Sequence, residues 1–183
     1  PFFVRYPMRS FPSDLSVQSG ATNALEALIA AVEPRLQMAD ARIAARRARL
    51  IERMRNRRAQ LTKDSAVGPR ISPEYLSRAI GETLGEDAVI FNEYPLRADH
   101  CPREKPGTFF AVGNAGGLGW GFGAALGAKL AAPDAFVVAT LGDGAYMFSN
   151  PTVGHWVSAA HDLPILTIVF NNGRYGAVRR ATL

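Results

Sequence analysis

Two short polar motifs in this sequence each follow an apolar run, and their residue types could bind a metal ion together with a phosphate. The first is Gly-Asp-Gly at 142–144, and the second is Asn-Asn-Gly at 171–173. Asp143 offers a carboxylate and Asn172 an amide oxygen, which are hard ligands that Mg²⁺ accepts. The glycines beside Asp143 carry no Cβ, so the backbone there can approach a phosphate closely. A lone Gly-Asp-Gly would indicate only a tight turn, but the two motifs together predict a magnesium and phosphate site.

The elements that must position these motifs are four apolar runs rich in β-branched and aromatic residues, at 88–91, 108–112, 135–141 and 165–170. The runs do not alternate with polar residues, which is typical of strands buried on both faces of a parallel sheet. Helices are expected from the cap at Ser72 to Gly85, over 117–131, and from the cap at Asn150 to Asp162. This order predicts an α/β fold with a doubly wound, mostly parallel sheet, preceded by a long helix. Ligands of such sheets bind beyond the carboxyl ends of the strands, where both motifs fall.

A glycine-rich stretch at 114–123 lies between the second run and the following helix. The segment from Gly119 to Ala124 fits the relaxed G-x-G-x-x-A pattern of dinucleotide-binding loops. The alternative is close packing of the helix on a strand, for which small residues are equally suited. A dinucleotide site would leave the Asn-Asn motif unexplained, and packing is therefore favoured.

Taken together, the motifs resemble those of thiamine diphosphate enzymes, in which Gly-Asp-Gly is followed by Asn-Asn after a stretch of similar length. Here the 26 residues at 145–170 separate the two motifs. The flanks are also similar, with Gly-Gly-Leu-Gly at 116–119 and Asn-Asn-Gly-Arg-Tyr-Gly at 171–176. Residues from about 68 to 183 look like the C-terminal, diphosphate-side domain of the acetolactate synthase, benzoylformate decarboxylase and pyruvate decarboxylase group.

The resemblance implies specific roles for residues of these motifs. Asp143 and Asn172 would bind Mg²⁺ through their side chains, and Arg174 would do so through its main-chain carbonyl. The residues that would lie at the diphosphate are Gly142, Gly144, Ala145 and Tyr175. Leu118 would press between the two cofactor rings, and the carbonyl of Gly116 would accept a hydrogen bond from the pyrimidine amino group.

The sequence departs from the family pattern in two places. Many relatives have Ser or Thr where this chain has Ala145, so one hydroxyl contact to phosphate is missing. Relatives also often have Ser or Thr after the first strand's Asn-Glu, whereas here Asn92-Glu93 is followed by Tyr94.

The family's proton-relaying glutamate belongs to a pyrimidine-binding domain that this chain lacks and that normally comes from a partner subunit. The resemblance therefore implies a fragment with half a site, inactive alone, from a homodimer or homotetramer.

Charge divides the 183 residues, whose formal net charge is +5, into two parts. Residues 1–64 hold 12 Lys and Arg against 6 Asp and Glu, whereas residues 65–183 hold 9 against 10. The first part resembles the end of a middle domain with a helix at 25–32 and a basic linker helix at 35–61. A nucleic-acid or membrane-surface helix is the alternative, but no aromatic residue interleaves with these arginines to stack on bases. We expect 1–64 and 65–183 to be the domains, with no nucleic-acid or membrane partner.

The other reactive side chains, the cysteine and the histidines, give weaker indications of a catalytic role. Cys101 is the single cysteine, so a disulfide within the chain is impossible, and no base that would activate the thiol is identifiable. His100 lies in the loop after the first strand and could reach a substrate. His155 and His161 fall on different faces of one helix and are expected to be ordinary packing or surface residues.

The function that we expect is thiamine diphosphate- and Mg²⁺-dependent decarboxylation or carboligation of a 2-oxo acid, as in acetolactate synthase. A simple 2-oxo acid decarboxylase is the alternative within the group, and a non-catalytic magnesium–diphosphate module is the alternative outside it. A cytoplasmic location is expected. Both ends of the sequence look like cuts through a longer protein.

Overall fold

The computed structural model describes residues 14–15, 17–36, 39–111, 113, 117–176, 179 and 182. The chain divides into two compact units, Pro1–Arg57 and Arg58–Leu183, and the division falls inside helix α2 (Asp40–Asp64). The domain boundary that we expect from the sequence, after residue 64, lies a few residues beyond this division and stays a prediction.

The first unit contains helix α1 (Ala21–Val32), the 3₁₀ turn η1 (Glu33–Arg35) and the first part of α2. The predicted helix at 25–32 is confirmed. The basic helix, expected from residue 35, begins instead at Asp40, because Pro34 lies in the 3₁₀ turn that ends the first helix. Asp40 in the first turn of α2 favours this start, since a negative charge is stabilising at a helix N-terminus.

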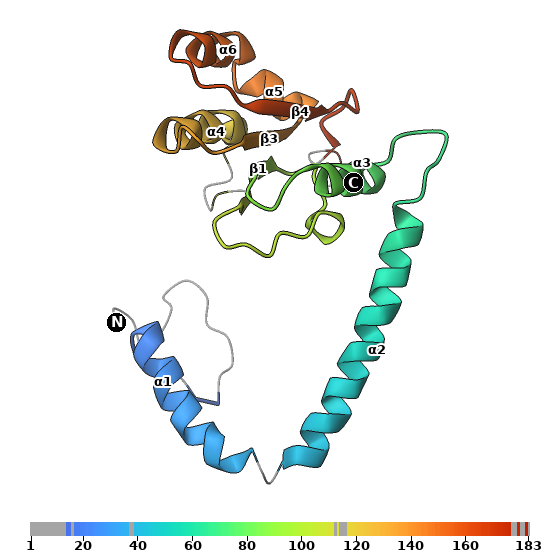
Figure 1. Ribbon diagram of the computed structural model, residues 1–183, viewed down its shortest axis with the longest axis vertical. Coiled ribbons are helices and arrows are strands. Elements are labelled where there is room, and N and C mark those ends of the chain that lie inside the picture. Colours follow the sequence, from blue (N-terminus) through green and yellow to red (C-terminus); the bar gives the residue numbers. More distant parts are fainter. Residues whose placement is uncertain are drawn as a thin grey trace. The chain divides into compact units, whose positions relative to one another are not determined.

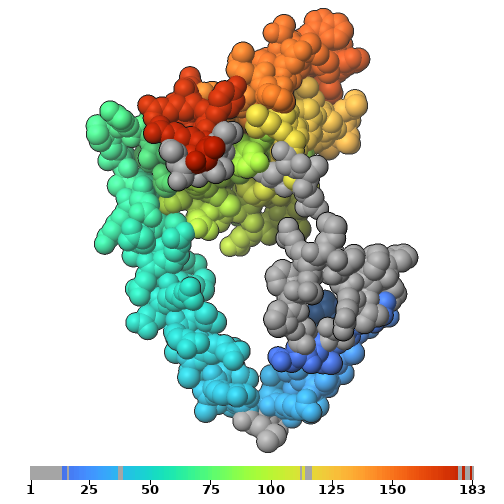
Figure 2. Space-filling model, turned by 180° about the vertical axis from the view of Figure 1, so that it is seen from behind, coloured from blue at the N-terminus to red at the C-terminus, as the bar shows by residue number. Residues whose placement is uncertain are grey.

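Helix α2 lies at the molecular surface along its whole length. None of its residues is buried, and Figure 2 shows its side chains, in cyan and teal, lining the surface. Its arginines lie on exposed positions, as do the apolar Leu50, Ile51 and Met54. No helix among the described residues has the length and apolar character that crossing a bilayer requires.

The second unit is a four-stranded parallel sheet with helices on both faces (Figure 1). Its strands are β1 (Val89–Glu93), β2 (Phe109–Ala111), β3 (Val137–Gly142) and β4 (Leu166–Phe170), in the order β2-β1-β3-β4. Its helices are α3 (Pro73–Thr83), η3 (Ala98–His100), α4 (Trp120–Ala131), α5 (Asp143–Phe148) and α6 (Pro151–Ala160). The predicted α/β fold with a parallel sheet and a preceding long helix is confirmed.

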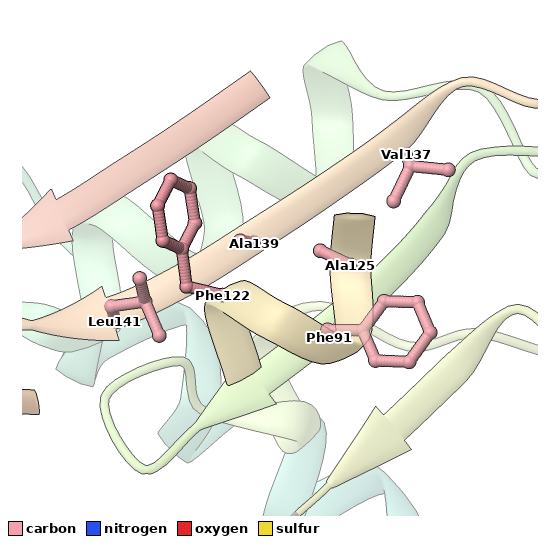
Figure 3. Close-up of a cluster of buried hydrophobic side chains, with 6 residues drawn as sticks. All are labelled: Phe91, Phe122, Ala125, Val137, Ala139 and Leu141. Atoms are coloured by element: carbon pink, nitrogen blue, oxygen red, sulfur yellow. The ribbon is translucent and has the colours of Figure 1, made fainter. Parts of the chain in front are cut away.

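The central strand β3 is buried on both faces, as its uninterrupted apolar run predicts. Val137, Ala139 and Leu141 pack in one cluster with Phe122 and Ala125 of α4, and Figure 3 shows α4 over this side of the sheet. On the opposite face, Val138 packs in a second cluster with Ile80 of α3 and with Ile90, Leu96 and Cys101.

The predicted N-cap residues precede their helices as expected, but not all of them form a capping hydrogen bond. The hydroxyl of Ser72 accepts a hydrogen bond from the backbone N–H of Tyr75 at 3.0 Å, so it caps α3 as expected. Asn150 precedes α6, but it has φ +54° and its side chain makes no capping hydrogen bond. The helix predicted from 117 begins at Trp120, because the residues before it form a turn with Gly119 at φ +89°.

Helices α4 and α6 approach each other closely where Gly154 faces Phe122. A Cβ added at Gly154 would lie 2.1 Å from Cε1 of the Phe122 ring. Phe122 is 1% exposed and belongs to the main core cluster, so its ring has no free space into which to move. Gly127, in contrast, lies in α4 with nothing within 4 Å of an added Cβ.

We predict opposite effects of alanine at these two helical glycines. Gly154→Ala overpacks the core and should lower the free energy of unfolding by about 1–3 kcal/mol. Gly127→Ala removes only backbone entropy from the unfolded chain and should raise it by about 0.5–1 kcal/mol. Urea unfolding followed by circular dichroism measures both, and equal stability of the two variants would contradict the packing described here.

Candidate functional site

The strand order creates a switch point between β1 and β3. The chain leaves β1 toward its neighbour β2 and leaves β3 toward β4 on the opposite side. Ligands of open α/β sheets bind beyond the carboxyl ends of strands at such a point. β1 ends at Glu93 and β3 ends at Gly142, so these two residues mark the place where a ligand is expected.

The Gly-Asp-Gly motif joins β3 directly to α5. Gly142 is the last residue of the strand, one residue beyond the predicted end, and Asp143 begins the helix. Asp143 is half-buried. Its carboxylate therefore stands at the end of the central strand and remains open to a ligand.

The parallel pairing of β3 with β4 brings the second motif to the first. Gly142 pairs with Phe170 in the sheet register, so the residues that follow these two strands emerge side by side. The backbone N–H of Asn172 donates to Oδ1 of Asp143 at 3.5 Å. Asp143 and Asn172, which are 29 positions apart in the chain, are thus neighbours in the structure.

Asn171 and Asn172 fold the turn after β4 with their own side chains. Oδ1 of Asn171 accepts from the N–H of Gly173 at 3.0 Å, and Oδ1 of Asn172 accepts from the N–H of Arg174 at 2.8 Å. Gly173 has φ +63°, a conformation that favours glycine. An amide oxygen has two lone pairs, so Asn172 retains one for a cation while it holds the turn.

Tyr175 lies against Gly144, and the two sequence motifs therefore meet a second time. A Cβ at Gly144 would lie 2.7 Å from Cε1 of the Tyr175 ring, so the absence of a side chain at Gly144 lets this exposed ring lie directly on its backbone. Ala145 is buried, which leaves its backbone rather than its methyl group for contact with a ligand. Arg174 is exposed within the same turn.

The glycine-rich stretch is described only in part. Gly116, the predicted acceptor for the pyrimidine amino group, lies outside the described residues. Leu118 is 39% exposed and directly precedes Gly119, which caps α4. The structure therefore leaves a large apolar side chain exposed next to the first turn of α4.

Glu93 lies in this region as well, and the sequence motifs indicate no role for it. It is the last residue of β1, is 0% exposed, and accepts from the backbone N–H of Gly119 at 2.6 Å and of Gly121 at 2.9 Å. One feature of the sequence does point to Glu93, since it is a carboxylate at the end of a predicted buried strand. A buried charge needs hydrogen-bond or charge partners.

The side chain of the neighbouring Asn92 holds the loop after β1, where the sequence departs from the family pattern. Its amide group donates to the carbonyl of Leu96 and accepts from the N–H of Leu96, both at 3.1 Å. Thr140 on β3 donates to the same Asn92 oxygen at 3.1 Å. Tyr94 then takes φ +75° in the loop that Asn92 closes.

The donor set suits a cation that shares its coordination shell with a ligand. No cluster of three or more His, Cys, Asp or Glu side chains exists among the described residues, so they form no all-protein metal cage. Asp143 and Asn172 supply two hard oxygens, and Mg²⁺ usually completes its shell with water, backbone carbonyls and phosphate oxygens. The residues present therefore fit Mg²⁺ bound together with a diphosphate.

The other candidate side chains have packing roles or stay untested. Cys101 is 1% exposed, and burial raises the pKa of its thiol, both of which disfavour a nucleophile. His155 lies 2.7 Å from the Tyr146 hydroxyl and packs on the ring of Phe122, as an ordinary packing residue does. His100 lies in η3, which packs against α3, and its predicted contact with a substrate stays a prediction.

Comparison with known proteins defines the class of this domain. Residues 94–183 match the family "Thiamine pyrophosphate enzyme, C-terminal TPP binding domain". Acetolactate synthase of Mycobacterium leprae is 35% identical over 114 residues, which are 60% of this chain and 18% of that protein. Benzoylformate decarboxylase of Pseudomonas aeruginosa is 32% identical over 116 residues, 61% of this chain and 21% of that protein.

A solved structure supports the same assignment. The thiamine diphosphate-dependent 4-hydroxybenzoylformate decarboxylase of Rhodococcus jostii RHA1 superimposes with a TM-score of 0.55 at 30% identity, over 64% of this chain and 22% of that chain. Residues 94–183 thus belong to the C-terminal domain family of the thiamine pyrophosphate enzymes. The chain spans about a fifth of the length of these relatives.

We predict that Cys101 does not react in the native protein. Its burial beside Gly81 and its raised pKa should protect it from a thiol reagent such as dithionitrobenzoate at pH 8, whereas unfolding in guanidinium should release one reactive thiol per chain. The absorbance of the released thiolate measures the reaction. Full labelling of the native protein within minutes would contradict this burial.

Proposed function

We propose that the full natural protein is a thiamine diphosphate- and Mg²⁺-dependent enzyme that decarboxylates a 2-oxo acid and joins the product to an acceptor, as an acetolactate synthase does. The observation that carries the proposal is the meeting of Asp143 with Asn172, in a domain of the thiamine pyrophosphate enzyme family. Chemistry on a 2-oxo acid is supported by the similarity to acetolactate synthase and benzoylformate decarboxylase.

In this proposal the turn after β4 and the start of α5 hold Mg²⁺ and the diphosphate. Asp143 and Asn172 bind the cation through their side chains, and Arg174 binds it through its backbone carbonyl. The ring of Tyr175 and the backbone of 142–145 line the diphosphate, where the absence of side chains at Gly142 and Gly144 allows close approach. Held by these residues at the end of β3, Mg²⁺ would offset the negative charge of the diphosphate.

The loop before α4 orients the rings of the cofactor. Leu118 is exposed there and would supply an apolar surface for them, and the carbonyl of Gly116 would accept a hydrogen bond from the pyrimidine amino group. Thiamine diphosphate supplies, when bound, a thiazolium ring that acts as the electron sink for loss of carbon dioxide from a 2-oxo acid. The contribution of this chain is binding and orientation, and no catalytic acid or base is assigned to it.

The proton-relaying glutamate is proposed to come from a pyrimidine-binding domain of a partner subunit, as the resemblance implies. This chain would then form half of a site in a homodimer or homotetramer, and it would be inactive without the other half. A simple 2-oxo acid decarboxylase is the second candidate, and the similarity to two decarboxylases favours it.

We predict that Asp143→Ala abolishes uptake of thiamine diphosphate by the full natural protein. Removing a ligand of the cation should weaken binding by about 100-fold or more, since even outer-shell partners of a metal site are worth roughly 10–100-fold. Isothermal calorimetry in Mg²⁺ and in EDTA measures the affinity, and the wild-type protein should bind only in Mg²⁺.

Asp134→Ala is the matched control, because Asp134 is exposed in the loop that precedes β3, at the opposite end of this strand. It removes the same charge and should leave the affinity unchanged. Equal binding by wild type and Asp143→Ala would refute the metal assignment, and equal binding in EDTA would refute the requirement for the cation.

The reaction itself is tested with pyruvate and other 2-oxo acids. We predict that the full natural protein releases carbon dioxide from one of them only when thiamine diphosphate and Mg²⁺ are both present. Chromatography of the products separates the two candidates, since acetolactate indicates the carboligase and acetaldehyde the decarboxylase. Failure to consume any 2-oxo acid, in protein that binds the cofactor, would contradict both and favour a non-catalytic module.

A further inference from the structure

The buried carboxylate of Glu93 joins the end of β1 to the start of α4. It is 0% exposed, and among the described residues it forms no salt bridge. Its two oxygens accept separately, Oε1 from the N–H of Gly119 and Oε2 from the N–H of Gly121. These N–H groups belong to the first turn of a helix and have no partner within it, and the positive end of the helix dipole favours the carboxylate.

The first turn of α4 is closely packed against its neighbours on both sides. A Cβ at Gly121 would lie 3.1 Å from Oε2 of Glu93 and 3.0 Å from Cδ2 of Leu141. On its other side, a Cβ at Gly119 would lie 2.9 Å from the backbone nitrogen of Ser149, just after α5. The turn is therefore fixed between the end of β1 and the end of the helix that Asp143 begins.

The orientation of the Leu118 side chain depends on this turn. It directly precedes Gly119, whose N–H is held by Glu93 at 2.6 Å and whose φ of +89° sets the path of the chain. Leu118 is itself 39% exposed, so its neighbours do not enclose it. The fixed backbone next to it therefore determines where its side chain stands.

We propose that Glu93 is a positioning residue for cofactor binding, which holds the Gly119–Gly121 turn so that Leu118 meets the rings of thiamine diphosphate. The proposal rests on the proposed function and adds a residue to it. Glu93 acts through Leu118, because its two oxygens are occupied by backbone N–H groups and it is shielded from solvent. A purely structural Glu93 would stabilise α4 without influence on Leu118, and the two roles differ in measurable ways.

A double-mutant cycle on the full natural protein separates these roles. Glu93→Gln keeps the shape but replaces one acceptor oxygen with an NH₂ group that cannot accept from a backbone N–H. Leu118→Ala removes the apolar contact. Each single variant should weaken binding of thiamine diphosphate with Mg²⁺ on the order of tenfold. The double variant should bind no more weakly than the weaker single variant, because both changes remove the same interaction.

A second readout is the near-ultraviolet circular dichroism of the bound cofactor at saturation. Thiamine diphosphate is achiral, so this signal reports the conformation that the site imposes. We expect Glu93→Gln and Leu118→Ala to lower the signal per bound cofactor, whereas a loss of stability alone would leave it unchanged. Thr140→Val is the control, because it removes a buried hydrogen bond of 3.1 Å to Asn92, the neighbour of Glu93, and does not touch α4.

The outcomes separate the inference from the function on which it rests. Additive losses of affinity, or an unchanged circular dichroism signal, in a wild-type protein that binds the cofactor would overturn only the role of Glu93. Absence of binding by the wild type would overturn the proposed function and this inference with it. If Glu93→Gln does not fold, Glu93→Asp, which keeps the charge but shortens the side chain by one methylene group, takes its place in the same cycle with the same criteria.

Discussion

The parallel pairing of β3 with β4 is the constraint on which the site depends. It sets Gly142 beside Phe170 at the carboxyl ends of the two strands, and Asp143 and Asn172 follow directly from these positions. A register shift of one residue would reverse the faces of every side chain on β4 and separate the two motifs. Apolar side chains of both strands fix that register, since Ile168 and Phe170 of β4 pack against the cluster that contains Val138 of β3, so the packing of the sheet and the geometry of the site have the same physical origin.

The parts that could be predicted from the sequence are those that depend on local pattern. Four apolar runs are sufficient for a parallel sheet, and motifs that directly follow such runs must lie at its carboxyl edge. The pairing of Glu93 with Gly119 and Gly121 could not be predicted in this way, because these glycines begin a helix rather than follow a strand, and only tertiary packing brings that helix start to the end of β1. The same holds for Gly154, which is glycine because a ring of α4 lies on it.

The uneven charge of the chain also has a structural counterpart. Most of the positive charge of the first 64 residues lies on the exposed helix α2, whereas the candidate site lies in the glycine-rich second unit, where acidic and basic residues nearly balance. At the candidate site in that unit, a half-buried carboxylate at Asp143 and a buried carboxylate at Glu93 each have a local role. The net charge of the whole chain therefore says little about the chemistry of the site.

The most direct measurement is an experimental structure of the full natural protein prepared with thiamine diphosphate and Mg²⁺. We predict a cation at about 2.0–2.1 Å from an Asp143 carboxylate oxygen and from Oδ1 of Asn172, with the diphosphate on the same cation. The rings of the cofactor should lie on Leu118, with Glu93 still bound to Gly119 and Gly121. A cofactor bound elsewhere, or a diphosphate at this edge without a cation between Asp143 and Asn172, would contradict it.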